Sequence, residues 1–399
     1  MAYIFKSDID KNEYEQFVSS HNQHSLLQSY NWSLIKNNWQ HKYIGVYENQ
    51  TLVATALILI KQLPLKQKFA YIPKGPILDY TNQKLTIFIF KQLKKLAKLE
   101  KWIFIRIMPN LTKQYTYQNQ IFDNEEIPKI IENLNLCSLK FLGDHKNMHD
   151  GFSPQYEAIT HINNQILESL PGQTTKFYNQ AIKRGVEFEL YKEQALDDFM
   201  DLINSTENKK QINLRDQQYF KKLLNSYPNS LIALASIYPK KQIDIIQRQI
   251  DDLIKQANVI KERQPKKYNS LQEQIKSLQK TLDTYIPLKN QEKVILYGVL
   301  FIIYGSTIEL LYAGTNFNAQ GFNAHYFTFY NLLKMAKDNN LKYMNMGGVA
   351  NSLDDGLSLF KSKFNPHFHK YLGECDLINS PKYHLFTLAW KLRKIIKKH

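Results

Sequence analysis

The chain has 399 residues, 43% of them hydrophobic and 22% charged, and its 52 Lys and Arg against 36 Asp and Glu give a formal net charge of +16. This length and apolar content exclude a disordered chain and predict two domains of ordinary size. With only Cys137 and Cys375, the sequence suggests neither a disulfide framework nor a structural zinc site.

The excess positive charge favours polyanionic partners such as RNA, anionic lipids or phosphorylated substrates. A composition rich in Lys, Asn and Ile also arises from an AT-rich genome, so charge alone does not choose among these partners. No run of about eighteen apolar residues occurs, and Lys6, Asp8 and Asp10 stand where a secretory signal needs an apolar core. We therefore expect a soluble, cytoplasmic protein.

The first half of the chain reads as strands and one helix. Residues 42–47 are apolar and rich in β-formers, residues 48–50 form a turn, and residues 52–63 form a second strand that ends at Pro64. After the segment 69–80, apolar residues recur with helical spacing from Leu85 to Leu96, and residues 102–108 form a buried strand.

A similar order recurs in the second half, with strands at 231–238, 294–304, 307–313 and 343–346 and a helix at 324–338. The recurrence predicts two copies of one domain and an α/β (α+β) fold class. We place the first domain at residues 1–152 plus 372–399, so that the C-terminal helix returns to it, and the second at residues 153–371.

Residues 240–286 interrupt the second copy with a different pattern. Apolar residues at alternating steps of three and four run through 243–260 and again through 268–285, around a polar turn at 262–267. This heptad pattern predicts an antiparallel coiled-coil hairpin that projects as an arm. Residues 240–289 hold eleven Lys or Arg and six Asp or Glu, a net charge of +5, which suits an RNA backbone. A solvated coiled-coil surface and a dimerisation arm are the alternatives.

Six short sequence segments, called strings below, carry a further signal. They are residues 27–36 (LQSYNWSLIK), 71–80 (YIPKGPILDY), 174–186 ending in KRGV, 213–220 (NLRDQQYF), 311–315 (LYAGT) and 356–364 (GLSLFKSKF). Together they resemble the Fem family of peptidoglycan-bridge aminoacyltransferases, along essentially the whole chain. The resemblance implies two tandem domains related to the acetyltransferase fold, with the helical hairpin inserted in the second.

The resemblance also implies a reaction and its partners. An amino acid of the Gly, Ala or Ser class would pass from aminoacyl-tRNA to the stem-peptide amine of a peptidoglycan precursor, which is lipid-linked or UDP-linked. Lys36 would contact the diphosphate and sugar of this precursor, and Arg215, Tyr219 and Tyr312 would hold the substrate. The tRNA would lie on arm residues such as Lys255, Arg263 and Lys266.

Lys361 would lie nearest the acyl-transfer chemistry, as the cation beside the developing oxyanion or beside the terminal RNA phosphate. The attacking amine must also lose a proton. Met108 stands where family members commonly have an acidic residue, and it cannot accept one. Solvent, the leaving RNA oxygen and a substrate carboxylate remain as alternative acceptors.

We expect no cofactor and no metal. Residues 315–323 lack the Gly-rich turn that holds coenzyme A in acetyltransferases, since only Gly314 and Gly321 lie in or beside this stretch. His367 and His369 alternate in a strand-like run near Lys361, but no acidic residue nearby would orient them for catalysis.

The last helix, residues 383–398, is basic and amphipathic. It packs on the first domain, or it rests on the inner face of an anionic membrane, and the two alternatives can coexist. Two other functions are compatible with the sequence. One is a non-catalytic RNA-binding or scaffold protein on the same fold, and the other is an N-acetyltransferase.

Overall fold

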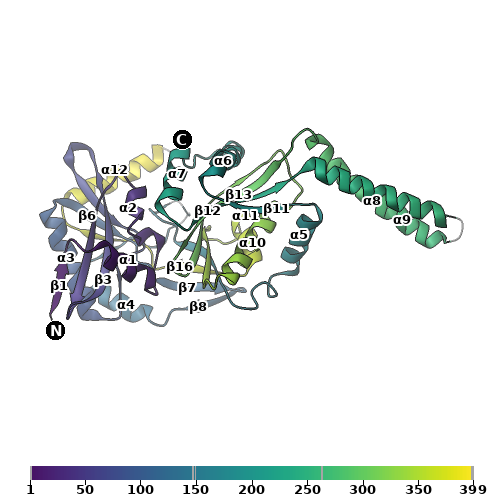
Figure 1. Cartoon of the computed structure of the whole chain (residues 1–399). Helices are drawn as coiled ribbons and strands as arrows, with labels where there is room; N and C mark the ends of the chain where they lie inside the picture. Colours follow the sequence, from purple (N-terminus) through teal and green to yellow (C-terminus); the bar gives the residue numbers. More distant parts are fainter. Residues whose placement is uncertain (1, 146–147, 149, 262–263, 397–399) are drawn as a thin grey trace. The chain divides into compact units, whose positions relative to one another are not determined.

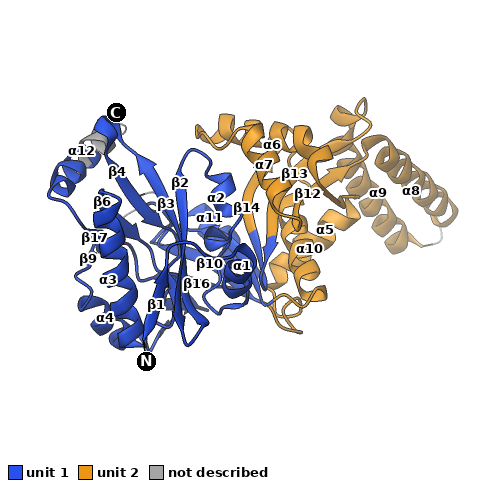
Figure 2. Ribbon diagram, turned by 60° about the vertical axis from the view of Figure 1, so that its left-hand side comes forward, with its two compact units in different colours: residues 1–161, 303–309, 342–399 blue, residues 162–302, 310–341 orange. Residues whose placement is uncertain are grey.

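The computed structural model describes residues 2–145, 148, 150–261 and 264–396. The chain forms two compact units, shown in blue and orange in Figure 2. Unit 1 comprises residues 1–161, 303–309 and 342–399, and unit 2 comprises residues 162–302 and 310–341. The architecture is mixed α/β, which confirms the fold class predicted from the sequence. Among the described residues, no helix is long and apolar enough to cross a membrane.

Unit 1 contains a mixed sheet with the strand order β1-β2-β3-β4-β6-β17-β9, and β5 pairs with β3. The strands are β1 (Tyr3–Lys6), β2 (Gln40–Glu48), β3 (Thr51–Gln62), β4 (Lys68–Ile72), β5 (Ile77–Leu78), β6 (Trp102–Ile107), β9 (Lys140–Phe141) and β17 (Cys375–Ile378). β4 and β6 run parallel, and the helix α3 (Gln83–Leu99) connects them. Every residue of β6 is buried, which agrees with the continuous apolar run in the sequence.

Helices complete the core of this sheet. α3 begins after Asn82, whose side chain accepts a hydrogen bond from the Leu85 amide, and its apolar face packs on the sheet beside α4 (Ile127–Asn135). α1 (Lys11–Ser20) and α2 (Trp32–Ile35) precede β2. The last helix, α12 (Lys382–Ile396), returns to unit 1, where the ring of Phe386 lies 4.9 Å from that of Phe104 on β6.

A second group of strands in unit 1 has the order β14-β15-β10-β16-β7-β8. These are β14 (Thr307–Thr315, of which residues 307–309 belong to unit 1), β15 (Tyr343–Gly348), β10 (Tyr156–His161), β16 (Pro366–Tyr371), β7 (Thr112–Tyr117) and β8 (Gln120–Asp123). β10 lies antiparallel to both β15 and β16. The short helix α11 (Gly356–Lys361) is capped by Asp355 and leads into β16.

Unit 2 contains β11 (Glu187–Tyr191), β12 (Ser230–Ile237), β13 (Val294–Tyr304, of which residues 303–304 belong to unit 1) and the remainder of β14, in that order. Its helices are α5 (Gly172–Lys183), α6 (Leu196–Lys210), α7 (Gln217–Ser226), α8 (Pro239–Ile260), α9 (Pro265–Tyr285) and α10 (Ala324–Asp338). α5 and α10 pack together, with the rings of Tyr178 and Tyr330 stacked at 3.8 Å. The predicted bounds of β13 and α10 agree with the structure.

Helices α8 and α9 lie side by side (Figure 1), and they occupy the segment for which the heptad pattern predicts two helices. The buried positions along them include Ile246, Ile250, Leu271 and Ile275, all on the predicted apolar seam. α9 begins at Pro265, inside the predicted turn, because proline is well suited to the first turn of a helix.

The compact units differ from the predicted domain bounds, which assign residues 153–371 to one domain. Residues 153–161, 303–309 and 342–371 lie in unit 1 instead, where β16 pairs with β7 of the predicted first domain as well as with β10. The cause is strand pairing between segments far apart in the chain, which periodicity does not reveal.

Candidate functional site

Two of the sequence strings meet at Gln28, which is fully buried. Its side-chain amide donates to the carbonyl of Pro73 at 2.6 Å and accepts from the amide of Leu57 at 2.8 Å. A Cβ on Gly75 would lie 2.7 Å from Cδ of Gln28, so only glycine fits there without a shift. Gln28 therefore holds the 71–80 string against β3.

A cavity of about 510 Å³ opens beside this contact in unit 1. Its walls are mainly aromatic and basic, and they include Trp32, Lys36, Trp39, Lys61, Tyr71 and Phe152. Nζ of Lys36 lies 5.2 Å from the centre of the Trp32 ring, and Nζ of Lys61 lies 5.3 Å from that of Trp39. The predicted site residue Lys36 thus lies in a cavity whose cations and flat rings suit a phosphorylated sugar.

The 71–80 string also contributes one residue, Lys74, to a buried ion pair. Lys74, which is 3% exposed, has its ammonium 3.0 Å from a carboxylate oxygen of Glu157 on β10 and 3.0 Å from the centre of the Tyr371 ring. The other oxygen of Glu157 accepts from the Tyr371 hydroxyl at 2.8 Å and from the Asn345 amide at 3.4 Å. Burial lowers the pKa of Lys74, and the carboxylate of Glu157 opposes that change.

Glu309, on β14, adds a second carboxyl to this group. Burial and the neighbouring charge of Glu157 raise its pKa to about 8, while Lys74 and a hydrogen bond with Asn345 act in the opposite direction. Two carboxyls in one enclosed region do not both ionise readily, and a pKa of about 8 favours the protonated form of Glu309 at neutral pH. A protonated carboxyl there can donate a hydrogen bond or exchange a proton.

Lys361, the residue predicted nearest the chemistry, is 5% exposed at the end of α11. Its ammonium donates to the carbonyls of Gly348 at 2.8 Å and Gly347 at 3.2 Å, where β15 ends. Burial lowers the pKa of Lys361 to about 8, and the charges of Glu157 and Asp355 oppose this change. Lys361 is therefore a buried cation that can lose a proton close to neutral pH.

The structure brings three other predicted residues together in unit 2. The Arg215 guanidinium lies 5.2 Å from the centre of the Tyr219 ring and hydrogen-bonds to Tyr312. The rings of Tyr219 and Tyr312 meet edge to face at 6.1 Å. Asp216 caps α7 by accepting from the amide of Tyr219, which places this tyrosine in the first turn. Burial and Tyr312 raise the pKa of Tyr219, so it stays a hydrogen-bond donor.

The remaining predicted residues lie apart from these groups. Lys255 is exposed on α8, and its Nζ lies 3.7 Å from Oδ1 of Asp252. Lys266 is exposed in the first turn of α9. Arg263 lies outside the described residues. Met108 is buried, and its carbonyl accepts from the amide of Gly75 at 3.0 Å, so position 108 supports the 71–80 string through its backbone.

Sequence reasoning missed the group formed by Lys74, Glu157, Glu309, Asn345 and Tyr371. Lys74 lies within the 71–80 string, which was the one available signal. The others lie on β10, β14, β15 and β16, and nothing in their local sequence marks them. Their proximity follows from strand order, which the sequence did not reveal.

The fold is similar to that of a known protein. The crystal structure of FemX superposes with a TM-score of 0.78 and 24% identity, and the match covers 96% of this chain and 99% of that one. A model of the FemAB family matches residues 9–391, and the chain therefore belongs to the FemAB family.

Relatives in this family match the chain over nearly its full length. The lipid II:glycine glycyltransferase of Staphylococcus haemolyticus (strain JCSC1435) is 25% identical over 411 residues, which cover 95% of this chain and 94% of the relative. The lipid II:glycine glycyltransferase of Staphylococcus aureus is 26% identical over 415 residues, with the same two coverages.

Proposed function

We propose that this chain transfers an amino acid, with glycine as the first candidate, from aminoacyl-tRNA to an amine of a lipid-linked peptidoglycan precursor. The observation that carries the proposal is the similarity, over 95% of the chain, to relatives named lipid II:glycine glycyltransferases. The arrangement of the predicted residues supports it. Lys36 lines a cavity with aromatic walls, and Arg215 lies against two tyrosines.

The reaction is aminolysis of an ester. The amine nitrogen attacks the carbonyl carbon of the aminoacyl ester, a C–N bond forms, and the bond from that carbon to the ribose oxygen breaks. The proton lost by the amine balances the one gained by the released ribose hydroxyl. The ester is already activated, so the reaction needs neither a nucleotide nor coenzyme A.

Each residue has a role suited to its surroundings. Lys36 binds the diphosphate, while the rings of the cavity pack against the sugars. Arg215 binds a carboxylate or phosphate of the precursor in the bidentate geometry that lysine lacks. Lys361 has three N–H groups, of which two donate to Gly347 and Gly348, and the third is directed at the developing oxyanion. The basic hairpin holds the tRNA, and the C-terminal helix contacts an anionic membrane surface that carries the precursor.

The direct test combines the purified chain, tRNA charged with Gly, Ala or Ser, and a lipid-linked or UDP-linked precursor. Mass spectrometry should show a precursor heavier by one amino acid residue, and acetyl-coenzyme A should not replace the charged tRNA. If no combination lengthens the peptide, the proposal is wrong. An acetylated product would instead identify an N-acetyltransferase.

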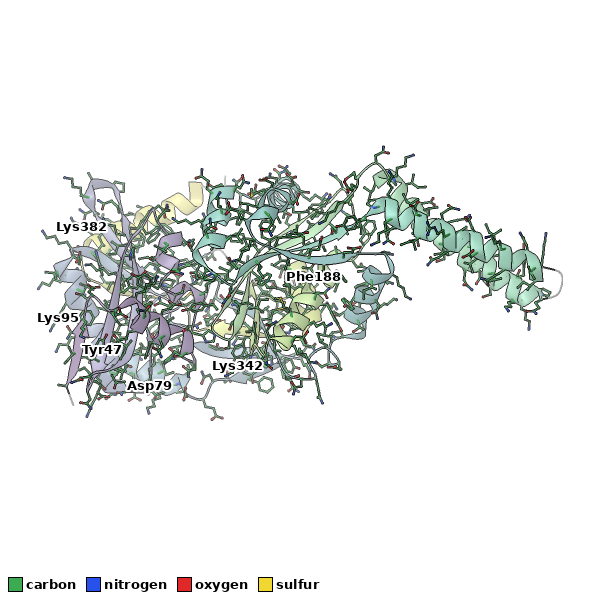
Figure 3. The ribbon with its side chains drawn as sticks, in the orientation of Figure 1. Tyr47, Asp79, Lys95, Phe188, Lys342 and Lys382 are labelled. Atoms are coloured by element: carbon green, nitrogen blue, oxygen red, sulfur yellow. The ribbon has the colours of Figure 1, made fainter. Side chains whose placement is uncertain are left out.

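The role of Lys361 is tested by Lys361→Met, which keeps an unbranched side chain of similar length and removes its charge. Loss of one oxyanion donor typically lowers kcat by about 100-fold or more. Lys95→Met is the matched control, because Lys95 is an exposed lysine on α3 (Figure 3). Equal kcat values for Lys361→Met and the control would remove Lys361 from the mechanism.

A further inference from the structure

Three histidines gather on one face of the β10–β16 pair in unit 1. In this antiparallel register Glu157 faces His369 and Ile159 faces His367, and His161 follows two residues further along β10. Alternate residues of a strand point to the same face. The three imidazoles therefore lie together at the end of the face that also carries Glu157 and Tyr371.

The ring nitrogens are close enough to share one ion. Taking one nitrogen from each histidine, all three atoms lie within 4.8 Å of one another. The Nε2 atoms of His161 and His369 are 3.4 Å apart. In a tetrahedral zinc site with Zn–N bonds of about 2.0–2.1 Å, two ligand nitrogens lie about 3.3 Å apart.

We infer that His161, His367 and His369 form a binding site for one divalent transition metal ion, with Zn²⁺ as the best-fitting ion. Three imidazoles without a carboxylate suit zinc, copper, nickel or iron, and they are poor ligands for Mg²⁺ and Ca²⁺, which prefer oxygen. Three protein ligands leave the fourth tetrahedral position for water or for a group of a substrate.

Two contacts around the histidines support this inference. Nδ1 of His369 lies 3.0 Å from the hydroxyl of Thr112 on β7, and when Nδ1 donates to that hydroxyl, Nε2 keeps its lone pair for a metal. Nδ1 of His367 is buried and makes no hydrogen bond to any described residue. An unpaired buried polar atom is costly, and a bound ion would satisfy it.

The ammonium of Lys74, whose charge acts on His369, is paired with Glu157 at 3.0 Å, which offsets its repulsion of an incoming ion.

One ring must turn before all three ligands can act. The rings of His161 and His367 are stacked with their centres 3.9 Å apart and their planes 21° apart, so their in-plane lone pairs run side by side. Rotation of the His367 ring about its side-chain bonds directs a nitrogen towards the Nε2 atoms of the other two. The His367 ring also stacks on Tyr115, with the ring centres 4.9 Å apart.

The test is a titration of the metal-free full chain with Co²⁺, whose visible absorption distinguishes tetrahedral from octahedral coordination. We expect one equivalent of tetrahedral Co²⁺, displaced by Zn²⁺, and a rise in Tm on adding Zn²⁺. His367→Ala and His369→Ala should abolish this spectrum, and His41→Ala, which alters an exposed histidine on β2, should leave it unchanged. Thr112→Val keeps all three ligands and should weaken binding by about 10- to 100-fold.

Wild-type chain that gives no tetrahedral spectrum would overturn the inference, whatever the variants do. So would a spectrum that survives in both alanine variants. The circular dichroism of each metal-free variant establishes that it is folded, so that a lost spectrum is assigned to a lost ligand. Metal binding and aminoacyl transfer are measured separately, so either result can fail without the other.

Discussion

Replacing Glu157 with Gln tests how strongly the buried ion pair stabilises unit 1. The substitution keeps the shape of the side chain but removes its charge. Lys74 then stays 3% exposed without its carboxylate, whose oxygen lies 3.0 Å from the ammonium. Tyr371 and Asn345 can still hydrogen-bond to the new amide, so the change acts mainly on Lys74.

The expected magnitude follows from the geometry. Two unit charges 3.0 Å apart attract by about 5 kcal/mol at an effective dielectric constant of about 20. Removing one partner of a buried pair costs about 3–5 kcal/mol in measured cases. Lys74 can escape part of this cost by losing its proton, since burial already lowers its pKa. We therefore expect Glu157→Gln to lower the free energy of unfolding by about 3 kcal/mol at neutral pH.

Deprotonation of Lys74 gives the variant a distinct pH dependence. With Gln in place of Glu157, the folded state binds the Lys74 proton more weakly than the unfolded chain does. The stability of the variant should then rise with pH towards 10.5, the ordinary pKa of lysine. The deficit relative to wild type should shrink over the same range.

The assay is urea unfolding followed by tryptophan fluorescence, which reports on unit 1 because all four tryptophans lie there. Glu100→Gln is the matched control. Glu100 also pairs with a lysine at 3.0 Å, but that pair is about one-third exposed, so its loss should cost at most about 1 kcal/mol.

Two results would refute the reasoning. One is equal losses of stability for Glu157→Gln and Glu100→Gln. The other is additivity in the double variant Lys74→Met plus Glu157→Gln. If the pair is coupled, removing both charges should cost clearly less than the sum of the single changes, because neither charge is left buried alone.

Three further predictions concern Glu309, Arg215 and the hairpin. Because the folded state raises the pKa of Glu309 from 4.5 to about 8, stability should fall as pH rises between these values. Glu309→Gln should reduce this slope by up to about 1.4 kcal/mol per pH unit in urea unfolding, and an unchanged slope would contradict the assignment. Arg215→Lys should raise the KM for the precursor by about tenfold with little change in kcat, and the reverse pattern in steady-state kinetics would argue against a binding role. Lys255→Gln combined with Lys266→Gln should raise the KM for charged tRNA and weaken its salt dependence, whereas Lys95→Gln should do neither.

The sequence by itself determined the elements whose cause is local. A continuous apolar run predicted β6, and helical spacing predicted α3 and the two hairpin helices, because one face of each helix must be apolar wherever it packs. Pro265 shifted the start of α9 by its own backbone preference. The six strings also marked Lys36, Arg215, Tyr219, Tyr312 and Lys361, and the structure then placed Arg215 beside the two tyrosines.

Only the tertiary structure decided which distant residues become neighbours. His161 and His369 are 208 positions apart in the chain, and Lys74 meets Glu157 through the pairing of strands rather than through any spacing. The same burial that unites these groups lowers the pKa of Lys361 and raises that of Glu309. Strand order and enclosure depend on the whole chain, because each strand's partner is chosen by packing and hydrogen bonding over the entire sheet rather than by its own residues.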